Sequence, residues 1–328
     1  MQARTTSSCS VRVARVKHCG ARTSIPKRCA SICSTPLPCA NTPHNPNACV
    51  KSLRRTQRKS RSSSTKSRNS PDLLAVVHLL IEHKSNQQYI LTGSSARTLR
   101  RHGVNLLGGR AAEKNLHPYT AAELGSQFTL AKALQQGMLP VVWAAHDPQA
   151  ILQAYNGLYL REEVQMEGLV RNIGTFARFL EAMSFAHGSV LNLAAVSRDC
   201  QVNRKTAEGY MQILEDLLLG FRLSVFSKRA KREVASHPKF YFFDAGVFRA
   251  NRPTGPLDSA AELDGAALEG LVAQHLRAWC EYSSGRHELH YWQTRSQVEV
   301  DFIVYGESGL FAVEVKNATE FALRIYAP

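Results

Sequence analysis

Three residues near the end of the sequence have the types and spacing of a site for a hard divalent cation. Asp301 lies in the alternating stretch 298–304, and Glu314 and Lys316 lie two residues apart in the next stretch, 311–316. Because side chains alternate along a strand, Glu314 and Lys316 are predicted on one face, and a hairpin brings Asp301 beside them. The two carboxylates can hold a cation such as Mg²⁺ that lowers the pKa of a bound water, while Lys316 orients that water or offsets phosphate charge.

This set resembles the Asp and Glu-x-Lys site of restriction-endonuclease-like folds. The resemblance adds an outer carboxylate, Glu269, on a helix predicted around residues 268–276. The implied catalytic residues are Asp301, Glu314, Lys316 and Glu269, with Asp301 and Glu314 as the metal ligands. Two interpretations stay open: a working metal-dependent nuclease, and an inactive structural copy of one.

A second set of motifs lies between residues 88 and 140. A predicted strand at 88–92 ends in Thr92-Gly93-Ser94-Ser95, and Gly109-Arg110-Ala111, Glu123-Leu124 and Gly137-Met138-Leu139-Pro140 follow in that order. These motifs resemble prokaryotic AAA-family ATPases, whose intact members bind ATP and Mg²⁺. The resemblance implies that Thr92 and Ser94 sense the nucleotide and that Arg110 contacts a phosphate, although Arg110 also fits an ordinary surface arginine.

The phosphate-binding loop that an ATPase needs is absent from the sequence as translated. A one-base shift of the reading frame lets residues 11–18 encode Gly-Pro-Arg-Gly-Thr-Gly-Lys-Thr, a Walker A loop. The same shift lets residues 62–68 encode an apolar strand ending in Asp-Glu, the form of a Walker B motif. We therefore expect residues 1–70 to be out of frame and the chain not to bind ATP, because the glycine-built cradle of backbone N–H groups is missing.

Residues 1–70 also carry all of the net charge. They hold 15 Lys and Arg and no Asp or Glu, whereas the whole chain has 41 basic and 26 acidic residues and a net charge of +15. A disordered basic arm that contacts nucleic acid is the alternative interpretation. The six cysteines of this region form no C-x-x-C pair, no secretory signal follows Met1, and no apolar run approaches the ~18 residues of a membrane span. A cytoplasmic protein, neither secreted nor membrane-bound, is expected.

The apolar spacing of residues 191–224 is typical of a helix-turn-helix. The break falls near Val202-Asn203, and strands at 223–226 and 239–243 would form a wing. Asn203 is predicted to cap the second helix, and Asn203 and Lys205 are candidate DNA contacts. A helical lid packed on an ATPase is the alternative, which the family resemblance favours.

The whole chain is therefore predicted to have an α/β fold. Its expected parts are a disordered region at 1–70, a remnant of a P-loop ATPase core at 71–145, a helical and winged-helix region at 146–240 and a truncated nuclease-like domain at 241–328. A second frame slip after Thr319 is expected to leave the final strand as an exposed edge. The predicted function is a disrupted AAA-family ATPase-like protein; a DNA-binding winged-helix protein and a metal-dependent nuclease are the alternatives. Nothing in the sequence indicates an oligomeric state.

Overall fold

The chain combines helices and strands, which confirms the predicted α/β class. A computed structural model describes residues 10–16, 62–66, 79, 89–92, 115–159, 164, 170, 172–227, 237–256, 258–294 and 298–316. The chain divides into two compact units. The larger comprises residues 1–27, 115–215 and 219–328, and the smaller comprises residues 28–114 and 216–218.

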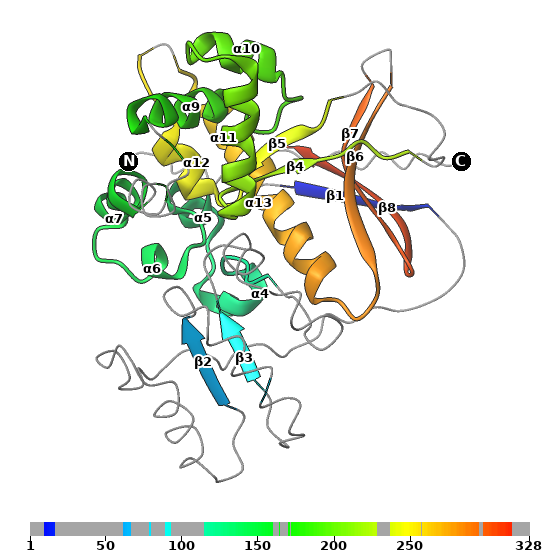
Figure 1. Ribbon diagram of the computed structural model, residues 1–328. Helices are drawn as coiled ribbons and strands as arrows, with labels where there is room; N and C mark the ends of the chain where they lie inside the picture. Colours follow the sequence, from blue (N-terminus) through cyan, green and yellow to red (C-terminus); the bar gives the residue numbers. More distant parts are fainter. Residues whose placement is uncertain are drawn as a thin grey trace, which may run out of the picture. The chain divides into compact units, whose positions relative to one another are not determined.

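Most helices of the larger unit are short, and one is long (Figure 1). They are α4 (Ala121–Leu124), α5 (Leu130–Gln136), α6 (Pro140–Trp143), α7 (Pro148–Ala154), α9 (Ile173–Phe185), α10 (Leu193–Asp199), α11 (Arg204–Asp216), α12 (Ala245–Asn251) and α13 (Ala260–Tyr282), with single turns at Gly125–Gln127 and Tyr155–Tyr159. Figure 1 shows the long helix α13 between the shorter helices and a sheet.

That sheet is antiparallel throughout and has the strand order β1-β8-β7-β6. Its strands are β1 (Ser10–Val16), β6 (His287–Gln293), β7 (Glu299–Gly306) and β8 (Gly309–Lys316). The predicted turn between β7 and β8 is confirmed, since Gly306 pairs with Gly309. Gly309 has a φ of 125°, a conformation that residues with a Cβ rarely adopt.

The prediction that the final strand exposes an edge is wrong. β1 pairs with β8 along its whole length, from Ser10 opposite Lys316 to Val16 opposite Leu310. An unpaired row of backbone N–H and C=O groups accepts another strand readily, and the Val-x-Val spacing at 11–13 suits one. Disorder was expected throughout residues 1–70, yet β1 and a second strand at 62–66 lie within that region.

Helix α13 packs on both sides. Toward the sheet, Ala273 joins a buried cluster with Tyr291, Phe302 and Val313. Toward the shorter helices, Leu271 packs with residues of α5 and α6. Small residues on α13 allow this close approach: a Cβ on Gly270 would lie 2.4 Å from Nε2 of His187, so a larger residue would force the elements apart.

The two helices predicted on either side of the break near Val202-Asn203 are confirmed, as α10 and α11. Phe176, Phe179, Leu180 and Met183 of α9 are buried as their spacing predicts. The antiparallel strands that follow are β4 (Gly220–Leu223) and β5 (Lys239–Phe242).

The strand predicted at 223–226 lies earlier in the sequence, at Gly220–Leu223. After Leu223 the chain leaves β5 and runs beside β6, where Val225 bridges Tyr291 and the Phe226 N–H donates to the Tyr291 carbonyl at 2.6 Å. The backbone of Tyr291 explains the difference, because its N–H donates to the Ser224 carbonyl and its carbonyl accepts from the Phe226 N–H.

The smaller unit contains β2 (Ser62–Lys66) and β3 (Tyr89–Thr92), which pair in parallel. The strand predicted at 88–92 is thus confirmed, and Thr92 is its last residue. Ser94 and Arg110 lie outside the described residues. Their predicted nucleotide-sensing roles, like that of Thr92, stay predictions.

Candidate functional site

Asp301 is fixed across the β7–β8 hairpin by a backbone donor. The Val315 N–H donates to Oδ2 of Asp301 at 2.7 Å, just beyond the last paired residues of the two strands. Burial raises the pKa of Asp301 to about 6; the Val315 N–H lowers it in part, and the neighbouring carboxylates of Glu269 and Glu314 raise it further. The hairpin therefore brings Asp301 to the Glu-x-Lys segment, as the alternation predicts.

Glu314 and Lys316 share one face of β8, as predicted. Lys316 Nζ lies 2.7 Å from Glu314 Oε1, and the Lys316 side chain is 59% exposed. On the other face, Val313 is buried and Val315 packs against the same core. The alternation thus gives β8 an apolar inner face and a charged outer face that solvent can reach.

Glu269 lies on α13, as predicted, and its carboxylate already has two donors. Lys239 Nζ lies 3.1 Å from Glu269 Oε1, and the Tyr241 hydroxyl donates to the same oxygen at 2.7 Å. Lys239 also forms an ion pair with Glu299 of β7. We call these four residues, Lys239, Tyr241, Glu269 and Glu299, the lysine cluster.

Lys239 is charged although its side chain is only 4% exposed. Burial alone would lower the pKa of Lys239, but the carboxylates of Glu269 and Glu299 outweigh that effect and raise it. Burial and the charge of Glu269 raise the pKa of Tyr241, so its hydroxyl stays protonated and donates. The cluster therefore places one buried positive charge between two carboxylates.

Lys239, Tyr241 and Glu299 are not among the residues predicted for the site. A signal for them exists in the sequence: Lys239 and Tyr241 alternate in an otherwise aromatic strand, and Glu299 alternates with Asp301. A lysine inside a buried strand needs a partner. Only the fold identifies that partner, because Glu269 is 30 residues away in the sequence.

The site suits an oxygen-liganded cation that keeps most of its water. Within the described residues no group of three or more His, Cys, Asp or Glu side chains is arranged to hold a metal ion. Asp301 and Glu314 supply two carboxylates, and Mg²⁺ is commonly held by one or two carboxylates together with water and phosphate oxygens. Burial is the main cause of the raised pKa of Asp301, and the carboxylates of Glu269 and Glu314 add to it; a bound cation would favour the ionised form. The donor set therefore fits Mg²⁺ or Mn²⁺ and not a closed zinc site.

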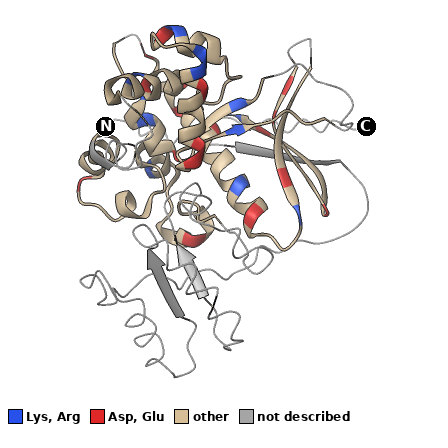
Figure 2. Ribbon diagram, viewed as in Figure 1, with Lys and Arg blue, Asp and Glu red and all other residues tan. Residues whose placement is uncertain are grey.

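The candidate DNA contacts lie at the start of α11. Asn203 Oδ1 accepts from the Thr206 N–H at 2.8 Å and from the Thr206 hydroxyl at 3.0 Å, which confirms the predicted cap. Lys205 is exposed, while its neighbour Arg204 pairs with Glu208 at 2.9 Å. Basic and acidic residues are interspersed on α10 and α11 (Figure 2). A DNA contact by Asn203 or Lys205 stays a prediction.

The Gly-Met-Leu-Pro motif has a structural role. Asp244 caps α12 by accepting from the N–H groups of Gly246 at 2.9 Å and Val247 at 3.1 Å, and it also accepts from the Met138 N–H at 2.6 Å. A Cβ on Gly137 would lie 2.0 Å from Oδ1 of Asp244, so the motif needs glycine there. Burial raises the pKa of Asp244 to about 6, against the three N–H groups that lower it.

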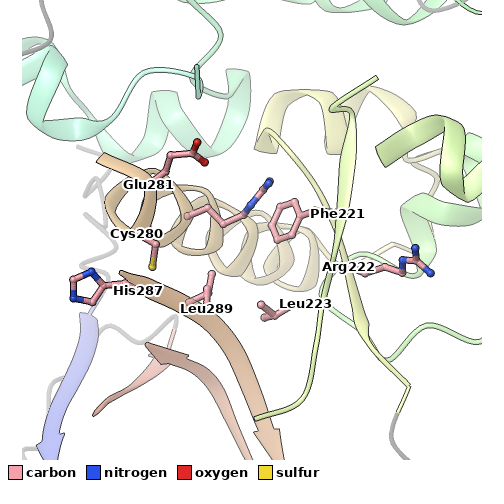
Figure 3. Close-up of a pocket in the computed structure, with 8 residues that line it drawn as sticks. Phe221, Arg222, Leu223, Cys280, Glu281, His287 and Leu289 are labelled. Atoms are coloured by element: carbon pink, nitrogen blue, oxygen red, sulfur yellow. The ribbon is translucent and has the colours of Figure 1, made fainter. Parts of the chain in front are cut away.

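A pocket of about 270 Å³ lies between β4, α13 and β6 (Figure 3). The Arg277 guanidinium stacks 3.9 Å from the centre of the Phe221 ring. Burial lowers the pKa of Arg277 to about 10. Figure 3 shows Arg222 pointing away from the other lining residues. Its guanidinium forms an ion pair with Glu215 at 2.5 Å. The pocket shares no lining residue with the lysine cluster or with Asp301 and Glu314.

Two family models match consecutive parts of the chain. Residues 127–257 match one described as "Domain of unknown function (DUF8612)", and residues 264–325 match "Domain of unknown function (DUF4143)". The latter domain is found in AAA-ATPase-associated proteins, which agrees with the predicted family at that coarse level. No helix in the described ranges is long and apolar enough to cross a membrane.

Two curated relatives are uncharacterized proteins of Mycobacterium bovis and Mycobacterium tuberculosis. Each is 26% identical over 258 residues, which cover 76% of this chain and 57% of the relative. No solved structure matches the chain. The chain is thus similar to longer proteins and spans little more than half of their length.

Proposed function

We propose that the chain is an AAA-family ATPase-like protein that does not bind ATP, and that its C-terminal domain is a Mg²⁺-dependent nuclease. The observation that carries the nuclease proposal is the anchoring of Asp301 on the Val315 N–H, beside the Glu314–Lys316 pair. One half-buried carboxylate, one partly exposed carboxylate and one exposed ammonium are then brought to one hairpin, a set that can support metal-dependent phosphodiester hydrolysis.

Each residue has a distinct role in this proposal. The bound cation would supply a water of lowered pKa and an electrophilic contact for a phosphate oxygen. Asp301 and Glu314 hold the cation, and the Val315 N–H fixes the direction of the Asp301 carboxylate. Lys316, more than half exposed, offsets the charge of the incoming phosphodiester. Glu269 stays outside the ligand set, because Lys239 and Tyr241 engage it.

The nuclease proposal is tested by cleavage of a fluorescently labelled DNA, single-stranded and duplex, with Mg²⁺, Mn²⁺ or EDTA. We expect cleavage with either cation, none with EDTA, and a loss of about 100-fold or more for Asp301→Asn, as for the removal of a group that acts directly in catalysis. Glu288→Gln is the matched control, since Glu288 is a 77% exposed carboxylate on β6 of the same sheet. Equal rates for Asp301→Asn and wild type would contradict the proposal.

The absence of ATP binding is supported by the sequence of residues 1–70, which contains no glycine-lined loop ending in Lys-Thr or Lys-Ser. Calorimetric titration of the full chain with MgATP tests this point. We expect no binding at millimolar nucleotide, and saturable binding at micromolar concentration would refute it.

A winged-helix DNA-binding function is the second candidate. It is favoured by the order α9, α10, α11, β4 and β5, with Lys205 exposed at the first turn of α11. Fluorescence anisotropy with a duplex tests it: Lys205→Ala should weaken binding several-fold and reduce the salt dependence by about one phosphate contact. Lys132→Ala serves as the control, because Lys132 lies on α5, outside the proposed DNA-binding helices, and donates to the Trp143 carbonyl of α6. Equal binding by the two variants would argue against the winged helix.

A further inference from the structure

The lysine cluster stands directly beside the carboxylates that are proposed to hold the cation. Glu269 and Lys239 both influence the pKa of Asp301, the first raising it and the second lowering it. Glu299 lies two residues before Asp301 on the same strand. The neighbourhood thus contains four carboxylates, of Asp301, Glu314, Glu269 and Glu299, of which two share a single ammonium.

Without Lys239, the carboxylates of Glu269 and Glu299 would suit a second cation. In two-metal sites the ions lie about 3.5–4 Å apart, and carboxylates from neighbouring elements hold them. Glu269 of α13 and Glu299 of β7 meet that description, because their Oε1 atoms both contact Lys239 Nζ. The ammonium already sits where an additional ion would have to bind. It cannot swing into solvent at little cost, since its side chain is 4% exposed.

We propose that Lys239 is a positioning residue that takes the place of a second divalent cation, so that the site of Asp301 and Glu314 holds one cation per chain. This inference rests on the proposed function, because it presumes that Asp301 and Glu314 bind a cation. Tyr241 supports the arrangement by donating to Glu269, which leaves that carboxylate turned toward the ammonium. The nuclease is then a one-cation enzyme, with Lys239 supplying the fixed second positive charge.

The direct test is electron paramagnetic resonance of Mn²⁺ bound to the full wild-type chain, combined with calorimetric titration. We expect one Mn²⁺ per chain and the six-line signal of an isolated ion, even at millimolar Mn²⁺. A spin-coupled pair of ions in the wild-type protein would overturn the inference without the need for any variant.

Lys239→Met sharpens the test by removing the buried charge. We expect two Mn²⁺ per chain in this variant, and a rise in the thermal midpoint on Mn²⁺ addition about twice that of wild type, which should be about 5–10 °C at 100 times the Kd. Lys239→Arg, which keeps the charge, should bind one ion. In Lys239→Met combined with Glu299→Gln, the second ion should be lost.

The outcomes separate the two proposals. A wild-type chain that binds no Mn²⁺, or binds it equally well after Asp301→Asn, defeats the proposed function. If wild type and a folded Lys239→Met variant each bind one Mn²⁺, only the proposed role of Lys239 is contradicted. Lys239 would then serve only to neutralise carboxylates inside the protein.

Discussion

Asp244 and Asp301 are two aspartates whose pKa is raised to the same extent, to about 6 in each, by burial. Their surroundings differ. Asp244 is 1% exposed and accepts from three backbone N–H groups, all of which belong to a helix cap and an adjoining loop. Asp301 accepts from one N–H and has carboxylates as further neighbours.

The difference shows that a raised pKa alone does not identify a functional carboxylate. At Asp244 every contact satisfies a donor of the protein itself, so the carboxylate organises α12 and the loop at 137–138. At Asp301 the carboxylates of Glu269 and Glu314 raise the pKa further beyond the effect of burial, and an external cation would favour the ionised carboxylate. Substitution should therefore cost much stability at Asp244 and little at Asp301.

The largest effect is expected for Asp244→Ala. This change leaves three buried N–H groups without an acceptor, each worth about 1–3 kcal/mol. We expect the free energy of unfolding to fall by about 3–5 kcal/mol, measured by urea denaturation followed by circular dichroism. A loss below about 1 kcal/mol would mean that the hydrogen bonds accepted by Asp244 contribute little to the stability of the larger unit.

The pH dependence of stability should also depend on Asp244. Its pKa is higher in the folded chain than in the unfolded chain, so the folded state binds more protons between about pH 4 and pH 6. Stability is therefore lost as the pH rises through this window. Relative to Asp244→Asn, the wild-type chain should lose about 2–3 kcal/mol between pH 4 and pH 7, measured by urea denaturation at each pH. If the free energy of unfolding changed with pH in the same way in both proteins, the raised pKa would not belong to Asp244.

A smaller effect is expected for Asn203→Ala. It removes the cap of α11 and should cost about 1 kcal/mol, whereas Lys205→Ala should leave stability within about 0.5 kcal/mol. Thermal unfolding of both variants checks this. Equal losses would show that the cap contributes little, and would leave the Asn203 side chain available for another role.

Asp301→Ala is expected to change stability far less than Asp244→Ala. Loss of the Val315 contact costs about 1 kcal/mol, and relief of repulsion from the neighbouring carboxylates offsets it. We expect a net change within about 1 kcal/mol by urea denaturation in EDTA, after allowing for the partial exposure of the site. A loss comparable to that of Asp244→Ala would place Asp301 among the structural carboxylates.

Local patterns in the sequence predicted the elements that carry the site. Alternation placed Glu314 and Lys316 on one face of β8, and helical spacing placed Glu269 on α13. The cap at Asn203 could likewise be predicted from the sequence, because capping involves residues three positions apart. These features depend on interactions within a few residues.

Features set by distant partners could not be predicted in the same way. The pairing of Lys239 with Glu269 and Glu299 joins residues 30 and 60 positions apart, and no local period encodes it. The same holds for β1, which pairs with a strand about 300 residues away, and for residues 224–226, which pair beside Tyr291 instead of continuing beside β5. Such choices depend on which backbone groups the rest of the fold leaves unpaired.

The most direct test of the central claim is a calorimetric titration of Mn²⁺ into the wild-type chain and into Asp301→Asn at pH 7.5, where Asp301 is ionised. If Asp301 and Glu314 form the cation site, wild type should bind one ion and Asp301→Asn should bind it about 100-fold more weakly, a difference of about 2.7 kcal/mol. Equal affinity in the two proteins, or no binding by wild type, would contradict the claim.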